Sequence, residues 1–160
     1  MDCYKGGINM YQISKKIVPK QRVVFIHYEG PIRDANKVFP KVFMSVKGKV
    51  NGAPFFRYIK MKPNNGLATV QLCVPTEETP SNHLVQTQEL EEVEVLSTTH
   101  HGSYETIMNA YSALDDYANK NKLKLTPPWS EVFIKGPGRF LKGNPKEYIT
   151  EIHFPYEEIK

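Results

Sequence analysis

The pattern of hydrophobic and polar positions occurs twice along the chain. An apolar, β-branched stretch over residues 23–29 ends on Gly30, and a second stretch over residues 93–101 ends on Gly102. Runs of this kind that stop at glycine are typical of strands followed by a turn. The same order of elements then follows each glycine, so the sequence predicts a duplicated fold.

After each glycine, apolar residues recur at helical spacing. The first set is Phe39, Val42, Phe43 and Val46, and the second is Ile107, Tyr111, Leu114 and Ala118. Residues three or four positions apart share one face of a helix, so each set predicts one amphipathic helix. Pro40 is predicted in the first turn of its helix, where a missing N–H is tolerated. Ser103 is expected to be the N-cap of the second helix.

A pair of strands is predicted after each helix. The first pair covers residues 53–59 and 67–75, and the second covers residues 128–134 and 148–155. Matching Gly30 with Gly102, Ile59 with Ile134 and Thr69 with Thr150 gives an offset that grows along the chain. The growing offset puts the extra residues of the second copy into loops, which tolerate insertions. A short turn is expected at residues 63–66 and a long one at residues 136–145.

Each copy is expected to gain one leading strand, over residues 11–18 in the first and 85–90 in the second. The result is an α+β fold of two ββαββ-like halves within a single domain of residues 11–160. The first repeat is predicted over about residues 11–78 and the second over about residues 82–158. Residues 1–10 are expected to be disordered or loosely attached.

Composition excludes several classes of protein. The 160 residues are 40% hydrophobic, and no apolar run reaches the roughly 18 residues of a membrane span. The two cysteines have neither metal-ligand nor disulfide spacing and no secretory signal is visible, so a cytoplasmic protein without metal or cofactor is expected. The net charge is +4, but the lysines are dispersed apart from short clusters such as residues 120–124. No nucleic-acid-binding motif appears, so neither nucleic acid nor membrane is expected as a partner.

Four segments carry a resemblance to a known family. They are residues 17–30, 100–107, 127–134 and 148–155. Together they look like the GyrI-like family, also called the AraC-type or BmrR-type effector-binding domain, which is related to the SOUL haem-binding fold. The resemblance covers roughly residues 11–158. It implies a pseudo-twofold pair of βαββ-type repeats, with two curved antiparallel sheets of about eight strands and two long helices around a central groove.

The resemblance also implies a function. Members of this family bind small molecules, often lipophilic or cationic aromatic compounds, and in many members the module is fused to a DNA-binding domain. About ten residues precede the first predicted strand, so a stand-alone binder is expected. A protein partner is a further possibility, because the family's name-giver is linked to DNA gyrase.

Glu131 is the strongest candidate for a ligand-binding residue. It lies between Trp129 and Phe133 in a predicted strand, where alternation places all three side chains on one face. A carboxylate between two aromatic rings suits a cation, because the rings add cation–π attraction to the charge. By resemblance, Glu131 matches the acidic residue at the centre of the family's groove. The alternative interpretation is an edge strand with Glu131 pointing to water.

The same glutamate also suits catalysis. By resemblance, some stand-alone members hydrolyse strained, DNA-alkylating cyclopropane compounds with a groove glutamate and a tyrosine. The candidate tyrosines are Tyr104, Tyr111 and Tyr148, and Tyr104 matches the family pattern best. A buried carboxylate of raised pKa would suit general acid or base chemistry.

The remaining candidates are weaker. Glu151 is a possible second acid if the last two strands pair, although Val70 at the matching position of the first copy favours plain packing. Candidate aromatic walls are Phe25, Phe56, Tyr58 and Phe154. The match of Ile59 with Ile134 sets Phe56 against Glu131, so the acid is expected in one half only.

Overall fold

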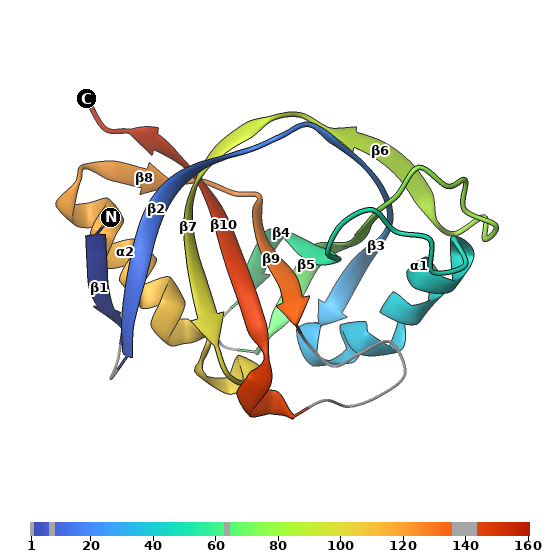
Figure 1. The fold of residues 1–160 in the computed structure, drawn as a ribbon, viewed down its shortest axis with the longest axis horizontal. Helices are drawn as coiled ribbons and strands as arrows, with labels where there is room; N and C mark the ends of the chain where they lie inside the picture. Colours follow the sequence, from blue (N-terminus) through green and yellow to red (C-terminus); the bar gives the residue numbers. More distant parts are fainter. Residues whose placement is uncertain (1, 7–8, 63–64, 136–143) are drawn as a thin grey trace. The chain divides into compact units, whose positions relative to one another are not determined.

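The chain folds into two compact units, as seen in a computed structural model that describes residues 2–6, 9–62, 65–135 and 144–160 (Figure 1). Unit 1 comprises Met1–Val18 with Val93–Lys160, and unit 2 comprises Pro19–Glu92. Each unit combines antiparallel strands with helical segments. The predicted α+β class is therefore confirmed.

The sheet of unit 1 has five strands in the spatial order β1, β2, β7, β10, β9, and β8 pairs with the end of β10. Their bounds are β1 Asp2–Gly6, β2 Asn9–Val18, β7 Val93–His101, β8 Leu123–Leu125, β9 Trp129–Lys135 and β10 Ile149–Glu158. The helical segments are η2 Tyr104–Thr106, α2 Met108–Lys120 and η3 Pro145–Glu147. In Figure 1 the yellow β7 lies between the blue β2 and the red β10.

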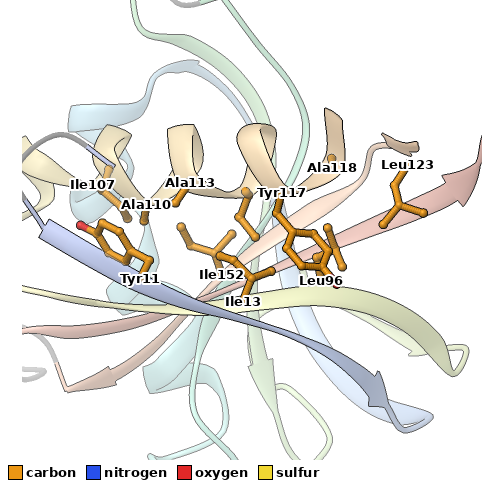
Figure 2. Close-up of a cluster of buried hydrophobic side chains, with 11 residues drawn as sticks. Tyr11, Ile13, Leu96, Ile107, Ala110, Ala113, Tyr117, Ala118, Leu123 and Ile152 are labelled. Carbon is orange, nitrogen blue, oxygen red and sulfur yellow. The ribbon is translucent and has the colours of Figure 1, made fainter. Parts of the chain in front are cut away.

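Helix α2 packs on one face of this sheet and forms the core of unit 1 with it (Figure 2). The helix contributes small and large apolar residues at helical spacing, namely Ala110, Ala113, Leu114, Tyr117 and Ala118. The strands contribute Tyr11 and Ile13 from β2, Leu96 from β7 and Ile152 from β10. The sequence stripe that predicts the helix therefore also predicts its buried face.

The sheet of unit 2 has four strands in the order β4, β5, β3, β6. The bounds are β3 Gln21–Pro31, β4 Phe55–Lys62, β5 Leu67–Pro75 and β6 Gln86–Leu90, with η1 Ile32–Lys37 and α1 Phe39–Ser45 after β3. Pro40 lies in the first turn of α1, as predicted. The helix has only seven residues, shorter than the family resemblance implies. Lys47 and Gly48 adopt positive φ angles of 55° and 69° just beyond it, a conformation that ends helices.

The leading strands pair differently from the expected repeats. Strand β2 pairs with β7, so Lys16 lies opposite Val95, whereas β6 pairs with β3, so Gln88 lies opposite Val23. Each leading strand thus joins the sheet built mainly from the other repeat, and the compact units differ from the predicted ranges 11–78 and 82–158. Within residues 1–10, which were expected to be loosely attached, Asp2–Gly6 instead forms β1 and pairs with β2.

The strand registers give a residue-by-residue match of the two repeats. The first strand of the pair that follows each helix contains one extra residue, Ile59 in β4 and Ile134 in β9, which is a bulge in both pairings. This confirms the match of Ile59 with Ile134 and therefore that of Phe56 with Glu131. With Gly30 matched to Gly102, the pairs His27–Gln71 and Thr99–Glu151 correspond. Gln71 therefore matches Glu151, and the expected match of Val70 with Glu151 is wrong by one position.

Three local predictions complete the picture. Strands β4 and β5 pair up to Lys62 opposite Leu67, which confirms the short hairpin, although residues 63–64 lie outside the described part. Most of the long turn, at residues 136–143, also lies outside it. Ser103 is the N-cap of η2, not of α2, and its side chain makes no capping hydrogen bond. Its carbonyl oxygen instead accepts a hydrogen bond from His100 Nε2 at 2.9 Å.

Candidate functional site

Glu131 lies on the face of the unit 1 sheet that packs against α2. It is opposite Ile152 of β10, whose side chain is fully buried in the core beneath the helix. Residues directly opposite on paired strands project to the same face. From the helix, the Tyr111 hydroxyl donates a hydrogen bond of 2.6 Å to Glu131 Oε2. The half-buried carboxylate is therefore held by the helix and does not only face water.

Trp129 adds a second link to this pair. Its indole N–H donates to the Tyr111 hydroxyl oxygen at 3.1 Å, so that hydroxyl accepts from Trp129 and donates to Glu131. The Trp129 ring stacks on Phe154 of β10 with centroids 5.2 Å apart and an interplanar angle of 8°. Phe154 also meets the Tyr111 ring edge-on at 6.3 Å. Two hydrogen bonds and one ring contact thus fix the orientation of the tyrosine beside the carboxylate.

Phe133 belongs to a second group of rings. The Tyr104 ring of η2 lies edge-on to Phe133 at 5.9 Å and packs against Tyr148 at 5.1 Å. Burial raises the pKa of Tyr104 well above its ordinary value of 10.0, with further contributions from Tyr148 and the charge of Glu131. Tyr104 therefore stays protonated at neutral pH and lies within electrostatic reach of the carboxylate.

The structure thus brings together most of the predicted residues of unit 1. Trp129, Glu131 and Phe133 all contact the segment from η2 to α2, as strand alternation predicts for side chains on one face. The geometry also distinguishes the candidate tyrosines. Tyr111 donates to Glu131, whereas the contacts of Tyr104 are with the rings of Phe133 and Tyr148. The helical stripe that contains Tyr111 was the sequence signal for its position.

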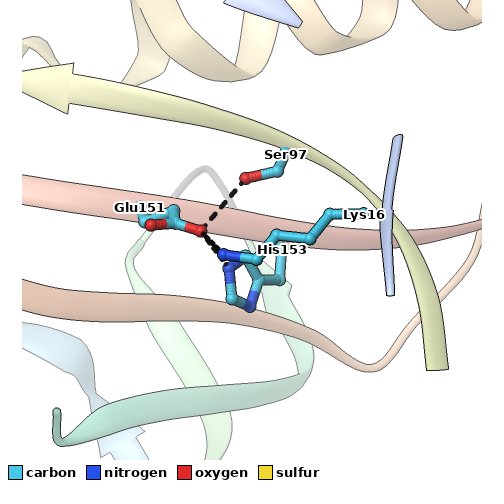
Figure 3. Close-up of polar contacts among 4 residues, drawn as sticks. All are labelled: Lys16, Ser97, Glu151 and His153. Atoms are coloured by element: carbon cyan, nitrogen blue, oxygen red, sulfur yellow. Dashed lines mark hydrogen bonds and ion pairs between the residues drawn. The ribbon is translucent and has the colours of Figure 1, made fainter. Parts of the chain in front are cut away.

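Glu151 does not belong to this group. It lies opposite Val132, one position away from the Glu131–Ile152 pair, so its side chain projects to the other face of the sheet. There Glu151 Oε1 accepts hydrogen bonds from Lys16 Nζ at 2.5 Å and His153 Nε2 at 2.7 Å (Figure 3). Ser97 Oγ also donates to it, at 3.4 Å. The prediction that Glu151 faces the neighbourhood of Glu131 is therefore wrong, because the pairing register places the two side chains on opposite faces of the sheet.

The charges of this second cluster shift each other's protonation. Burial opposes ionisation of Glu151, but the hydrogen bonds from Lys16 and His153 outweigh it and lower the pKa of the carboxyl. Burial lowers the pKa of His153 below 6.5, although the hydrogen bond to Glu151 acts in the opposite direction. At neutral pH the cluster therefore contains an ionised carboxylate and a neutral imidazole.

The predicted aromatic residues of unit 2 are buried. Phe25, Phe56 and Tyr58 are 6%, 6% and 3% exposed. Phe56 meets the ring of Phe39, at the start of α1, edge-on at 5.5 Å. Their role as walls of a ligand groove stays a prediction.

The histidines at the two matching strand ends do not form a chelating group. His100 is fully buried and bonded to Tyr11 and Ser103, whereas His27 and His101 are exposed. Among the described residues, no three His, Cys, Asp or Glu side chains lie close enough together to hold a metal ion. In the same part of the chain, every helix is too short or too polar to cross a bilayer.

Comparison with known proteins defines the fold class. No family model and no curated protein matches the sequence. Among solved structures, the C-terminal domain of EcmrR is similar, with a TM-score of 0.79 and 23% identity over 93% of this chain and 99% of that domain. The chain spans 58% of the EcmrR chain in its complex with DNA.

Two other solved structures share the fold at lower identity. A hydrolase from Listeria innocua has a TM-score of 0.63 and 10% identity over 91% of this chain and 92% of its own. SAV2435, solved with bound tetraphenylphosphonium, has a TM-score of 0.63 and 14% identity over 91% of this chain and 94% of its own. These likenesses show the fold, and they agree with the GyrI-like, BmrR-type effector-binding fold that the sequence resembles.

Proposed function

We propose that the protein is a GyrI-like small-molecule-binding protein that takes a lipophilic aromatic cation at Glu131. The observation that carries this proposal is the 2.6 Å hydrogen bond from Tyr111 to Glu131, within a group of aromatic rings. The carboxylate supplies a counter-charge, and the rings of Trp129, Tyr111 and Phe154 supply faces and edges for an aromatic ligand.

The physical reason for an aromatic cation is the combination of partial burial and charge. A compact, strongly hydrated cation loses much solvation when it enters a half-buried site, whereas a large delocalised cation loses less. Such a cation gains from cation–π attraction, worth up to about 2 kcal/mol when desolvated, and from burial of its own apolar surface. SAV2435, which shares the fold, was solved with tetraphenylphosphonium, and this makes that compound a suitable first probe.

The sequence provides an internal reporter for this site, because Trp129 is the single tryptophan of the chain. We expect tetraphenylphosphonium to change the Trp129 fluorescence saturably and to raise the unfolding midpoint. Glu131→Gln should weaken binding by on the order of tenfold or more, since the counter-charge is lost. The exposed Glu92→Gln is the matched control and should bind as the wild type does.

A neutral ligand separates charge from shape. Triphenylphosphine oxide presents similar rings without the cationic charge, so it should bind more weakly than tetraphenylphosphonium and be insensitive to Glu131→Gln. Equal titrations in wild type and Glu131→Gln would reject Glu131 as the counter-charge. The lack of any response to a panel of aromatic cations would instead favour a protein partner.

Hydrolysis of strained cyclopropane compounds is a second candidate function. It is favoured by two tyrosines near one carboxylate. Tyr111 donates a hydrogen bond to Glu131, and the raised pKa of Tyr104 keeps its hydroxyl protonated near the same charge. In this reaction Glu131 would activate water and a tyrosine hydroxyl would protonate the leaving group. Product formation from such a compound, lost in Glu131→Gln, would support the enzyme. The comparison of Tyr104→Phe with Tyr111→Phe would identify the acid.

A further inference from the structure

Unit 2 contains a half-buried arginine on the sheet face away from α1. Phe56 packs against Phe39 at the start of the helix, and the next residue of β4, Arg57, projects to the opposite face. Arg57 Nη1 donates to Oε1 of Gln71, its partner on β5, at 2.9 Å. This positions the guanidinium against a neutral amide.

The carbonyl of that amide is shared by two donors. Gln71 Oε1 also accepts a hydrogen bond from Gln88 Nε2 of β6 at 2.9 Å. The NH2 group of Gln71 and the Nε–Nη2 edge of Arg57 therefore remain as donors, and neither has an acceptor among the described residues. A guanidinium edge of this kind matches two oxygens of a carboxylate or phosphate group.

Within the described part of the chain, Arg57 also has no ion-pair partner. Burial lowers the pKa of Arg57, and Cys73 acts in the opposite direction. Cys73 is itself buried, which raises the pKa of its thiol and keeps it neutral. A positive charge is thus held partly out of water without a carboxylate to compensate it.

The matching position of unit 1 contains the missing anion. The strand registers match Gln71 with Glu151. They also match Gln88 with Lys16, because these residues lie opposite Val23 and Val95, which are matching positions of the two repeats. In unit 1 the central residue is Glu151, whose carboxylate accepts hydrogen bonds from Lys16 and His153. In unit 2 the central residue is an uncharged amide beside a cation. The polar centre is therefore charge-compensated in unit 1, whereas in unit 2 it contains a cation without a counter-charge among the described residues.

We propose that Arg57 and Gln71 form a binding site for the carboxylate or phosphate group of a small molecule. The oxoanion lies against the Nε–Nη2 edge of Arg57 and accepts a further hydrogen bond from the amide of Gln71. It supplies the negative charge that the Glu151 carboxylate supplies in unit 1. This proposal does not depend on the function proposed for Glu131.

The test is a titration of 15N-labelled full-length protein with acetate and, separately, inorganic phosphate at constant ionic strength, with chloride as the reference. The Nε–H resonance of Arg57, assigned by its loss in Arg57→Lys, should shift saturably. Saturation by acetate alone assigns a carboxylate ligand, and saturation by phosphate assigns a phosphate group. A linear shift equal to that with chloride would overturn the proposal.

Gln71→Glu provides the decisive variant, because it places in unit 2 the carboxylate that unit 1 already has. It should pair with Arg57 and weaken binding of the external oxoanion by at least about tenfold. The exposed Arg33→Gln removes the same charge from unit 2 and should leave the titration unchanged. An unaltered titration in Gln71→Glu would also overturn the site. This comparison holds even if Arg57→Lys fails to fold, since neither variant alters Arg57 and its Nε–H resonance can be assigned instead through bonds from the Arg57 backbone.

Discussion

The Tyr11 hydroxyl donates a hydrogen bond of 2.9 Å to Nδ1 of His100, a residue 89 positions later in the chain. His100 Nε2 donates to the Ser103 carbonyl oxygen, which can only accept, so both ring nitrogens of the histidine have a hydrogen-bond partner. The histidine is fully buried and joins β2 to the turn before η2. Its role in the described structure is therefore to satisfy backbone and side-chain hydrogen bonds.

Tyr11→Phe should destabilise the protein by about 1–3 kcal/mol, because it leaves a buried acceptor without a donor while keeping the ring. Urea denaturation measures the change in unfolding free energy. His101→Gln, at the exposed neighbouring position, is the control and should change it little. A loss below about 0.5 kcal/mol for Tyr11→Phe would contradict the importance of this bond.

Tyr111→Phe should cost about 1–2 kcal/mol, because both the Trp129 indole and the Glu131 carboxylate lose their partner on the helix. Tyr104→Phe removes a hydroxyl that has no hydrogen bond to any described residue, so a smaller change is expected. Chemical denaturation followed by Trp129 fluorescence compares the two variants directly. Equal losses would mean that the hydrogen bond to Glu131 contributes nothing of its own.

Stability should fall as the solution is acidified from about pH 7 to pH 5. The pKa of His153 in the folded state is below 6.5, so the unfolded chain binds the proton more tightly and is favoured increasingly below that pH. Glu151 has the same sign at lower pH, since its folded pKa is below 4.5.

His153→Gln should flatten the fall below about pH 6.5 and leave a loss of stability at pH values near and below 4.5. Unfolding free energies measured across this range test it, with the exposed His83→Gln as the control. An unchanged slope in His153→Gln would exclude this histidine as the titrating group.

Gly102→Ala should destabilise unit 1 by about 1–3 kcal/mol, because the glycine has a φ of +121°, where L-residues are strained. Its match in the first repeat, Gly30, has a φ of +152°. Gly66 is the contrast, since its φ of +65° is left-handed helical and a Cβ there meets no atom within 4 Å. Thermal unfolding should therefore show Gly66→Asn to be nearly neutral, and an equal shift for both variants would refute the argument.

Sequence periodicity predicted the elements better than their partners. The glycine-terminated strands, both helices and the shared face of Trp129, Glu131 and Phe133 follow from local patterns. The partners of the leading strands do not follow from such patterns, because the residue patterns of β2 and β6 are compatible with pairing in either sheet. Strand pairing depends on long-range contacts that no short window contains.

For Glu151, an error of one position in matching the two repeats gave the wrong counterpart in the first repeat. Matching Thr69 with Thr150 set Val70 rather than Gln71 against Glu151, and the registers correct that match by one position. In the pairing of β10 with β9, Glu151 lies opposite Val132, so its side chain is on the other face of the sheet from Glu131. Tyr111 was easier to place, since its helical stripe fixes which side of α2 meets the sheet.

The pairing of β2 with β7 has a consequence for synthesis on the ribosome. Val18 and Val93 are partners at the end of this ladder, but the whole of Pro19–Glu92 is translated between them. Unit 2 can thus emerge complete while β2 has no strand of β7 to pair with. Strand β2 is therefore made well before the strand that it pairs with, and closing so long a loop makes assembly of unit 1 the slow stage.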